Sequence, residues 1–321
     1  MINVVSFPGL GLEFTLNRVA FSLLGRPIYW YGILIGIGFL LAVMLCCKRA
    51  PQYGLTEDHV LDALFYAVPL GLIGVRAYYV IFYLDLYRRA DGSLDWAAIF
   101  RYSDGGLAIY GGLIGGILGI ILFARRRKIS FLAFVDLCVL GLPLAQAIGR
   151  WGNFMNVEAY GAVTGVPWRM CSESIANELW AKGLLDTEAA YFAIIEGEMG
   201  VHPTFLYESI WNLAGFILMY FLGKYTRRFD GQLFFSYVLW YGVGRTWIEG
   251  MRTDSLLFFG MELFGVPIRT SQVLAFSSAA AAGVILLWQF RKKHGPDSLY
   301  VNRVADLARE EQTDNGTEEE S

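Results

Sequence analysis

Residues 149–161 read GRWGNFMNVEAYG, and they follow an apolar run, residues 131–148, that is nearly long enough to cross a bilayer. Besides three glycines, these 13 residues hold four strongly polar side chains: Arg150, Asn153, Asn156 and Glu158. An arginine fork suits phosphate, and asparagine amides both donate and accept hydrogen bonds. We therefore expect a polar site at the membrane interface that holds an anionic lipid headgroup. The alternative is a helix-capping turn whose arginine snorkels to the headgroups.

The composition around this stretch indicates a membrane protein. The chain has 321 residues, of which 55% are hydrophobic and only 17% are charged, whereas soluble domains carry roughly 25% charged residues. We expect an all-α polytopic protein, because lipid offers no hydrogen-bonding partner to open backbone. About seven spans are predicted, at 28–47, 60–82, 107–124, 131–148, 205–223, 233–248 and 271–290.

The basic residues at the ends of these spans predict the orientation. With seven spans, four Lys and Arg clusters fall on one side, which the positive-inside rule assigns to the cytoplasm: 48–49, 125–128, 224–228 and 291–293. The N-terminus is then outside, and the polar segment 157–202 is also outside. Residues 1–27 are expected to form an interfacial arm. The acidic end of the cytoplasmic tail, 291–321, is expected to be disordered.

Several function classes are disfavoured by the sequence. The four cysteines and three histidines are too scattered for a metal site, so we expect no metal. No basic stretch suggests a nucleic-acid surface, and the first residues do not resemble a cleaved signal peptide. A glycine-rich third span, residues 111–119, favours close helix packing over chemistry.

Charged groups in membrane spans are costly and are therefore candidates for function. Arg76 lies in the second span, and His202 opens the stretch HPTFLYE before the fifth span. Arg245 and Glu249 close the sixth span four residues apart, so they share a helix face. A buried ion pair without further role remains the alternative for Glu249.

These stretches together resemble the bacterial prolipoprotein diacylglyceryl transferases. GRWGNFMNVEAYG is similar to the family signature, and five other stretches agree in order over residues 25–290: IYWYGILIGIGF, GVRAYYVIFY, DGGLAIYGGLIGG, HPTFLYES and YGVGRTWIEGMRTD. The resemblance implies transfer of the diacylglyceryl group of phosphatidylglycerol to the lipobox cysteine of a preprolipoprotein signal peptide. It implies a thioether product, released glycerol phosphate, no cofactor, and a site at the outer face of the bacterial plasma membrane.

The resemblance also implies roles for single residues. Arg150 and Arg245 are expected to stabilise the leaving phosphate, with Glu249 beside them. The substrate-binding residues are expected to be Tyr31, Arg76, Asn153, Asn156, Glu158 and Gly161. Several family members have a histidine where this chain has Tyr110, and tyrosine titrates too high to be a good base at neutral pH. We hypothesise that the arginines lower the thiol pKa, assisted by Glu249, His202 or Tyr110.

Two other functions remain possible on residue chemistry alone. A transporter or channel would carry charged residues along a path, but it should also show paired broken helices or a repeat, and neither is evident. A different headgroup enzyme, such as a phosphatase, would need a metal cluster or a nucleophile and base pair.

Overall fold

The computed structural model describes residues 2–89, 91–102, 105–252, 257–263 and 266–319, with side chains described outside 253–268 and 311–321. The chain divides into two units. The first comprises Met1–Met44 with Cys138–His294, and the second comprises Leu45–Leu137 with Gly295–Ser321. Each unit is described by itself below.

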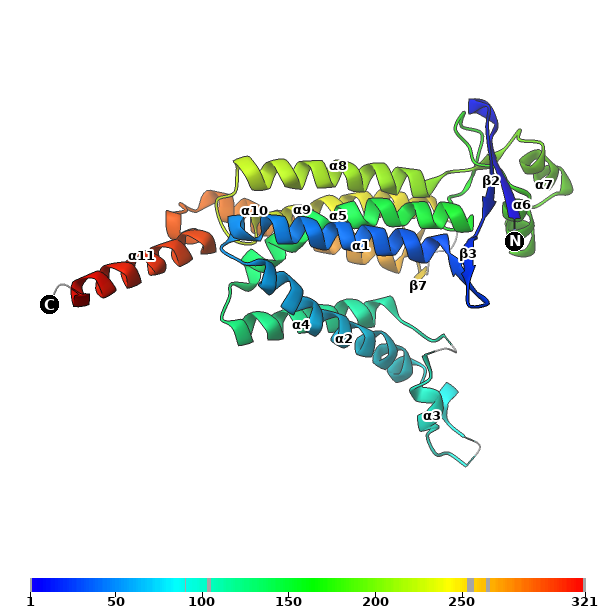
Figure 1. The fold of residues 1–321 in the computed structure, drawn as a ribbon. Coiled ribbons are helices and arrows are strands. Elements are labelled where there is room, and N and C mark those ends of the chain that lie inside the picture. Colours follow the sequence, from blue (N-terminus) through cyan, green and yellow to red (C-terminus); the bar gives the residue numbers. More distant parts are fainter. Residues whose placement is uncertain (1, 90, 103–104, 253–256, 264–265, 320–321) are drawn as a thin grey trace. The chain divides into compact units, whose positions relative to one another are not determined.

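Six helices in the described part of the chain are long and apolar enough to cross a membrane (Figure 1), which confirms the predicted polytopic helical fold. They are α1 (Trp30–Arg49), α2 (Glu57–Phe82), α4 (Ile109–Arg127), α5 (Phe131–Asn156), α8 (Thr204–Tyr225) and α10 (Thr270–Arg291). The predicted span 233–248 lies in α9 (Gln232–Met251), a helix of 20 residues. This helix is outside the apolar set because its tyrosines, tryptophans and the pair Arg245 and Glu249 make it more polar.

The second unit is built on the close packing of α2 against α4. Glycines of α4 lie against the backbone of α2: a Cβ atom on Gly111 or Gly115 would collide with the carbonyl oxygen of Gly74 or Leu70. The glycine run thus serves helix packing, as its spacing predicts. At the opposite end of this pair, Arg127 forms an ion pair with Asp62.

The second unit also contains 3-10 turns, a short helix and a longer C-terminal helix. After α2 come the 3-10 turn η3 (Leu84–Tyr87) and the short helix α3 (Trp96–Ile99). The turns η2 (Ala50–Tyr53) and η5 (Pro296–Ser298) and the helix α11 (Tyr300–Glu319) complete it. The sequence predicts a disordered acidic tail, whereas in the structure the helix α11 extends to Glu319.

The N-terminal arm, which the sequence predicts to be interfacial, is made of short strands beside the helical membrane region. Residues 2–29 form two antiparallel hairpins, of β1 (Ile2–Phe7) with β2 (Leu12–Asn17) and of β3 (Val19–Leu23) with β4 (Arg26–Tyr29). Two further pairs are β5 (Val163–Thr164) with β6 (Gly200–Val201) and β7 (Leu257–Leu263) with β8 (Val266–Arg269). Gly11 and Gly25, both at positive φ, allow the tight turns of the first two hairpins.

The segment expected outside, 157–202, folds onto the first hairpin. It contains α6 (Glu173–Ala181) and α7 (Glu188–Ile195), and Ser6 of β1 exchanges two backbone hydrogen bonds of 2.9 Å with Cys171. Val5, Ile175 and Ile194 are fully buried in a core that also includes Phe154 at the end of α5. We call residues 157–202, together with the hairpin of β1 and β2, the head.

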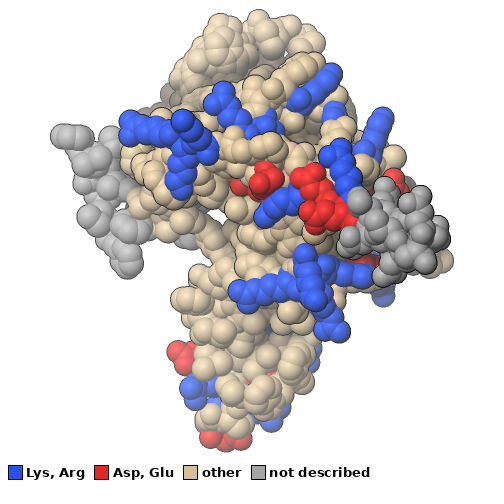
Figure 2. Space-filling model, turned by 90° about the vertical axis from the view of Figure 1, so that its left-hand side faces the viewer, with Lys and Arg blue, Asp and Glu red and all other residues tan. Residues whose placement is uncertain are grey.

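The basic clusters of the first unit lie together at the end away from the head. Arg228, after α8, stacks on Phe290 of α10, and Phe229 stacks on His294. Figure 2 shows Lys and Arg side chains spread over the face that carries the C-terminal ends of α8 and α10.

Candidate active site

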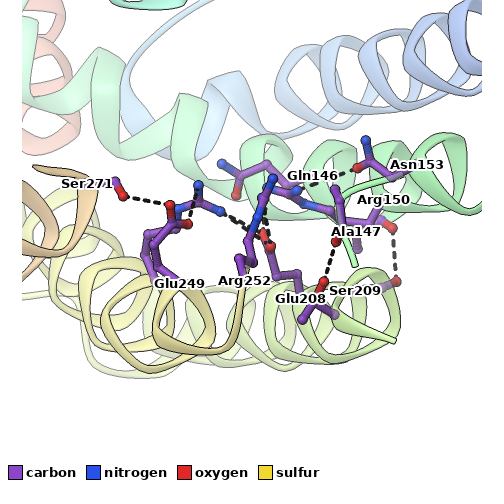
Figure 3. A network of polar contacts seen from close by, with 12 residues as sticks. Gln146, Ala147, Arg150, Asn153, Glu208, Ser209, Glu249, Arg252 and Ser271 are labelled. Atoms are coloured by element: carbon purple, nitrogen blue, oxygen red, sulfur yellow. Dashed lines mark hydrogen bonds and ion pairs between the residues drawn. The ribbon is translucent and has the colours of Figure 1, made fainter. Parts of the chain in front are cut away.

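Glu208 is the centre of a buried ion-pair network in the first unit (Figure 3). Its side chain, 5% exposed, accepts from Arg150 Nη2 at 2.5 Å and from Arg245 Nη1 at 3.3 Å, and Arg252 Nη1 lies at 3.7 Å. Glu208 comes from the second turn of α8, Arg150 from α5, and Arg245 from α9. Three helices are therefore joined through one carboxylate.

Glu249 extends the network along α9. Arg245 Nη2 lies 2.6 Å from Glu249 Oε2, and Ser271 of α10 donates to Glu249 Oε1 at 2.7 Å. The predicted four-residue pair is thus formed, and it is anchored to a fourth helix. In the ion pairs described, three guanidinium groups lie around two buried carboxylates, Glu208 and Glu249.

The motif residues continue the network from Arg150. Arg150 Nη1 lies 3.5 Å from Asn153 Oδ1. The amides of Asn153 and Asn156 donate to the same oxygen, Glu158 Oε1, at 3.0 and 3.1 Å. Since α5 ends at Asn156, the side chains of Asn153 and Asn156 lie in its last two turns. They are three residues apart and are therefore neighbours on one face of the helix. The structure therefore brings together Arg150, Asn153, Asn156 and Glu158, as the sequence predicts.

The turn after α5 has an unusual backbone. Val157 and Ala159 have φ of 53° and 57°, a left-handed backbone conformation that is rare for residues other than Gly, Asn and Asp. Each such residue costs on the order of 1–3 kcal/mol, which the surrounding contacts must offset. Val157 is held in the head core, and Thr204 donates to the Ala159 carbonyl. The turn sets the position of Glu158.

Gly161 joins two other parts of the site through its backbone. Its N–H donates to the His202 carbonyl at 2.9 Å, and it forms a bridge with Arg252. A Cβ atom here would lie 2.8 Å from the His202 Cβ and 3.0 Å from the Met251 oxygen. Gly161 is therefore required for this close approach, and it positions the segments that carry His202 and Arg252.

His202 lies at the junction between the head and α8. Its Nδ1 is 3.1 Å from the hydroxyl of Tyr207, which also accepts from Trp168 Nε1 at 2.6 Å. Burial lowers the pKa of His202 below its usual value near 6.5. The imidazole is therefore neutral at neutral pH and can accept a proton.

An open cavity of about 550 Å³ lies beside the motif and includes two predicted substrate-binding residues, Tyr31 and Asn156. Arg18, Ile28 and Tyr29 of the hairpins also line it. The Tyr31 ring packs against Gly152, where an added Cβ would lie 2.7 Å from the ring. The cavity is thus continuous with the motif at Asn156.

Arg76 and Tyr110 belong to the second unit. The five N–H groups of Arg76 all donate to backbone carbonyls, those of Ala98, Ile99, Arg101, Gly105 and Gly106, at 2.6–3.0 Å. Arg76 therefore organises the loop before α4 and has no donor left for a headgroup. Tyr110 is half-exposed in the first turn of α4.

The sequence prediction omitted Glu208, Arg252 and Arg18 as site residues. Glu208 could have been predicted from the sequence, because a carboxylate inside a membrane span needs a cationic partner. Arg150 and Arg245 in turn needed an anionic partner. Arg252 and Arg18 gave no comparable signal, since both lie outside the predicted spans.

This arrangement defines a class of protein: a multi-pass helical membrane protein with a buried, arginine-rich network that suits a phosphate-bearing ligand. A family model described as prolipoprotein diacylglyceryl transferase matches residues 18–288, and the chain belongs to this family.

Curated relatives cover most of the chain and carry one name, phosphatidylglycerol--prolipoprotein diacylglyceryl transferase. The relative from Clostridioides difficile (strain 630) is 40% identical over 260 residues, 81% of this chain and 90% of its own length. Relatives from Enterococcus faecalis (strain ATCC 700802 / V583) and Geobacillus kaustophilus (strain HTA426) are also 40% identical, over 288 and 280 residues. These matches cover 89% and 87% of this chain, and 94% of each relative.

Proposed function

We propose that this protein transfers the diacylglyceryl group of phosphatidylglycerol to the lipobox cysteine of a preprolipoprotein, the first step of bacterial lipoprotein maturation. The observation that carries the proposal is the network of three arginines around Glu208, formed by the stretches that resemble the family. Membership of the family supports the same reaction.

The reaction exchanges a carbon–oxygen bond for a carbon–sulfur bond. The thiolate sulfur of the lipobox cysteine attacks the diacylglyceryl carbon that bears the phosphate oxygen. The new C–S bond is a thioether, and the electron pair of the broken C–O bond stays with the oxygen of glycerol phosphate. The thiol proton must leave before or during the attack, because the thiolate is the nucleophile. No nucleophile from this chain is needed.

Arg150 and Arg245 stabilise the charge that develops on the leaving phosphate. Their side chains are 21% and 19% exposed, so solvent screens them little and a phosphate can still reach them. Glu208 and Glu249 are positioning residues in this scheme, because they hold the guanidinium groups before substrate arrives. Fixed donors of this kind stabilise a transition state without reorganising during the reaction.

Among the three candidates, we propose His202 as the proton acceptor. It is neutral at neutral pH, whereas Glu249 is engaged by Arg245 and Ser271. Tyr110 keeps its hypothesised assisting role through its hydroxyl. Replacing Tyr110 with Phe tests this role: unchanged transfer removes the tyrosine hydroxyl from the mechanism.

The protein is proposed to lie in the bacterial plasma membrane with the head outside. The basic ends of α8 and α10 are on the side opposite the head, as the positive-inside rule requires for cytoplasmic ends. The N-terminus is then outside and the C-terminus inside. The lipobox cysteine of a translocated signal peptide would reach the site from the same outer face.

The test uses purified protein in detergent with phosphatidylglycerol and a lipobox peptide. We expect the peptide to gain the mass of one diacylglyceryl group and one glycerol phosphate to be released per modified peptide. A peptide with serine in place of the cysteine is the matched control and should stay unmodified. Failure of the folded protein to release glycerol phosphate would overturn the proposal, and transport would become the function to test.

A further inference from the structure

Two tryptophans tie α8 to α9 beside the arginine network. The indole of Trp211 on α8 stacks on that of Trp240 on α9, with ring centroids 4.3 Å apart and 17° between the ring planes. Trp211 Nε1 donates to the Trp240 carbonyl at 3.1 Å, and Trp240 Nε1 donates to the Trp211 carbonyl at 3.0 Å. The two helices are therefore joined at one level by a reciprocal pair of hydrogen bonds.

A glycine opposite each indole allows this close approach. Gly215 follows Trp211 and Gly244 follows Trp240 at the same spacing, so each helix carries a tryptophan and a glycine one turn apart. A Cβ atom on Gly215 would lie 2.6 Å from Trp240 Nε1, and one on Gly244 would collide with Trp211 Nε1. We call these four residues the interlock. A shift of one residue along either helix, about 1.5 Å, would move both indoles off their glycines.

The interlock lies next to the contact between Glu208 and Arg245. Glu208 is one turn before Trp211 on the same face of α8, and Arg245 directly follows Gly244 on α9. All four of these residues line one small cavity. Arg245 Nη1 lies 3.3 Å from Glu208 Oε1, and a shift of about 1.5 Å between the helices would break this contact. The register that the interlock sets is therefore the register that this ion pair needs.

Arg245 is held by carboxylates on two different helices. Glu249 lies 2.6 Å from Arg245 Nη2, and this contact is set by spacing within α9 alone. Glu208 holds Nη1 only while α8 keeps its place beside α9. The direction in which the Arg245 guanidinium points thus depends on the interlock.

We propose that Trp211 and Trp240 are positioning residues for the transfer reaction. Their interlock sets the register of α8 against α9, and this register holds the Arg245 guanidinium on Glu208 in the direction of the leaving phosphate. The inference rests on the proposed function for the reaction that it serves. The competing role is helix packing alone, without a specific effect on Arg245.

The experiment begins with Trp211→Phe, which keeps an aromatic ring but removes the indole N–H. We expect kcat, expressed per folded protein, to fall by about tenfold, since misplacing a catalytic group by 1 Å can cost about 100-fold. Trp240→Phe should give the same loss, and the double variant should lose no more, because either change opens the interlock. The matched control is Trp288→Phe on α10, whose indole is exposed, and it should keep the wild-type kcat.

The decisive comparison repeats Trp211→Phe in an Arg245→Lys background, which keeps the charge but loses the planar fork. If the tryptophans act through Arg245, the further loss of kcat is less than about twofold, because residues that act as a unit are not additive. Packing alone would lower kcat by the same factor in both backgrounds, and that result would overturn the proposal. Wild-type kcat in the folded Trp211→Phe and Trp240→Phe variants would also overturn it.

Thermal unfolding in detergent gives a readout that is independent of turnover. Arg245→Gln should lower the melting temperature of the wild-type chain more than that of Trp211→Phe, because opening the interlock has already weakened the contact of Arg245 with Glu208. Equal shifts would show that the interlock does not position Arg245. If these shifts differ but the wild type releases no glycerol phosphate, the proposed reaction fails and the coupling between the interlock and Arg245 stands.

Discussion

Glu208 compensates more charge than any other residue of the described network, since three arginines lie around it. We expect Glu208→Gln to lower the free energy of unfolding by roughly 3–5 kcal/mol, because it removes the buried negative charge that Arg150 and Arg245 share. Thermal unfolding in detergent measures this. The matched control is Glu178→Gln, which breaks an exposed pair with Lys182 on α6 and should have little effect. Equal losses in the two variants would contradict the central position of Glu208.

The lowered pKa of His202 makes the stability of the folded protein depend on pH. Burial lowers its pKa, so the unfolded chain takes up a proton near pH 6.5 and the folded chain only at lower pH. Stability is therefore full above about pH 6.5 and falls as the pH drops towards the folded-state pKa. The melting temperature of wild type relative to His202→Gln should be constant above this pH and decrease below it. A difference that is the same at pH 5 and pH 8 would refute the assignment.

At the scale of residues, the sequence predicted many of the side chains that meet in the polar network. Arg150, Asn153, Asn156, Glu158, Arg245 and Glu249 do lie in one network, because short helical spacing fixes most of their contacts. Glu208 was missed because its partners come from two other helices, and sequence spacing does not reveal which helices meet. Arg76 was placed in the headgroup site, yet its donors are used by loop carbonyls 22–30 residues away.

At the scale of elements, the close packing of α2 against α4 predicts that alanine has different effects at two neighbouring glycines. A Cβ at position 115 would collide with the Leu70 carbonyl, whereas at position 116 the nearest atom, the Ala67 oxygen, lies at 4.0 Å. Gly115→Ala should destabilise the protein by about 1–3 kcal/mol through overpacking. Gly116→Ala should be neutral or stabilising, because alanine favours a helix. Similar melting temperatures for both variants would show that the two helices do not pack this closely.

The membrane-spanning helices were predicted from the sequence, whereas the strands of the N-terminal arm were not, and the reason is physical. A helix that crosses lipid leaves a long apolar run, and the cost of open backbone in hydrocarbon makes that run decisive. The hairpins of residues 2–29 have strands of only 4–6 residues, and part of their stability comes from contacts with the head 150 or more residues later. Such contacts cannot be read from local pattern.

We propose that segment 165–200 of the head guides the signal peptide to the site. Deleting residues 175–195 would test this role only if the rest of the protein stayed folded. Ile175, Leu179 and Ile194 are at most 1% exposed, so the deletion removes the head core. Replacing exposed Phe192 with Ser keeps the core. Unchanged transfer to a full-length preprolipoprotein would then remove Phe192 from the proposed guiding surface.

For the whole molecule, the proposed orientation predicts which positions are accessible in intact cells. In a chain whose four native cysteines are replaced by serine, Glu198→Cys in the head should react with a membrane-impermeant maleimide. Lys293→Cys, after α10, should react only once the membrane is permeabilised. The reverse pattern would invert the topology and place the site on the cytoplasmic face.

The central claim is that Arg150 and Arg245 stabilise the leaving phosphate. The most direct measurement assays peptide lipidation and glycerol phosphate release together for wild type, Arg150→Gln, Arg245→Gln and the control Arg26→Gln. We expect both products to fall in step by about 100-fold or more in the two site variants, as for loss of a transition-state donor, and to be unchanged in the control. Wild-type turnover by a folded Arg150 or Arg245 variant would contradict the account.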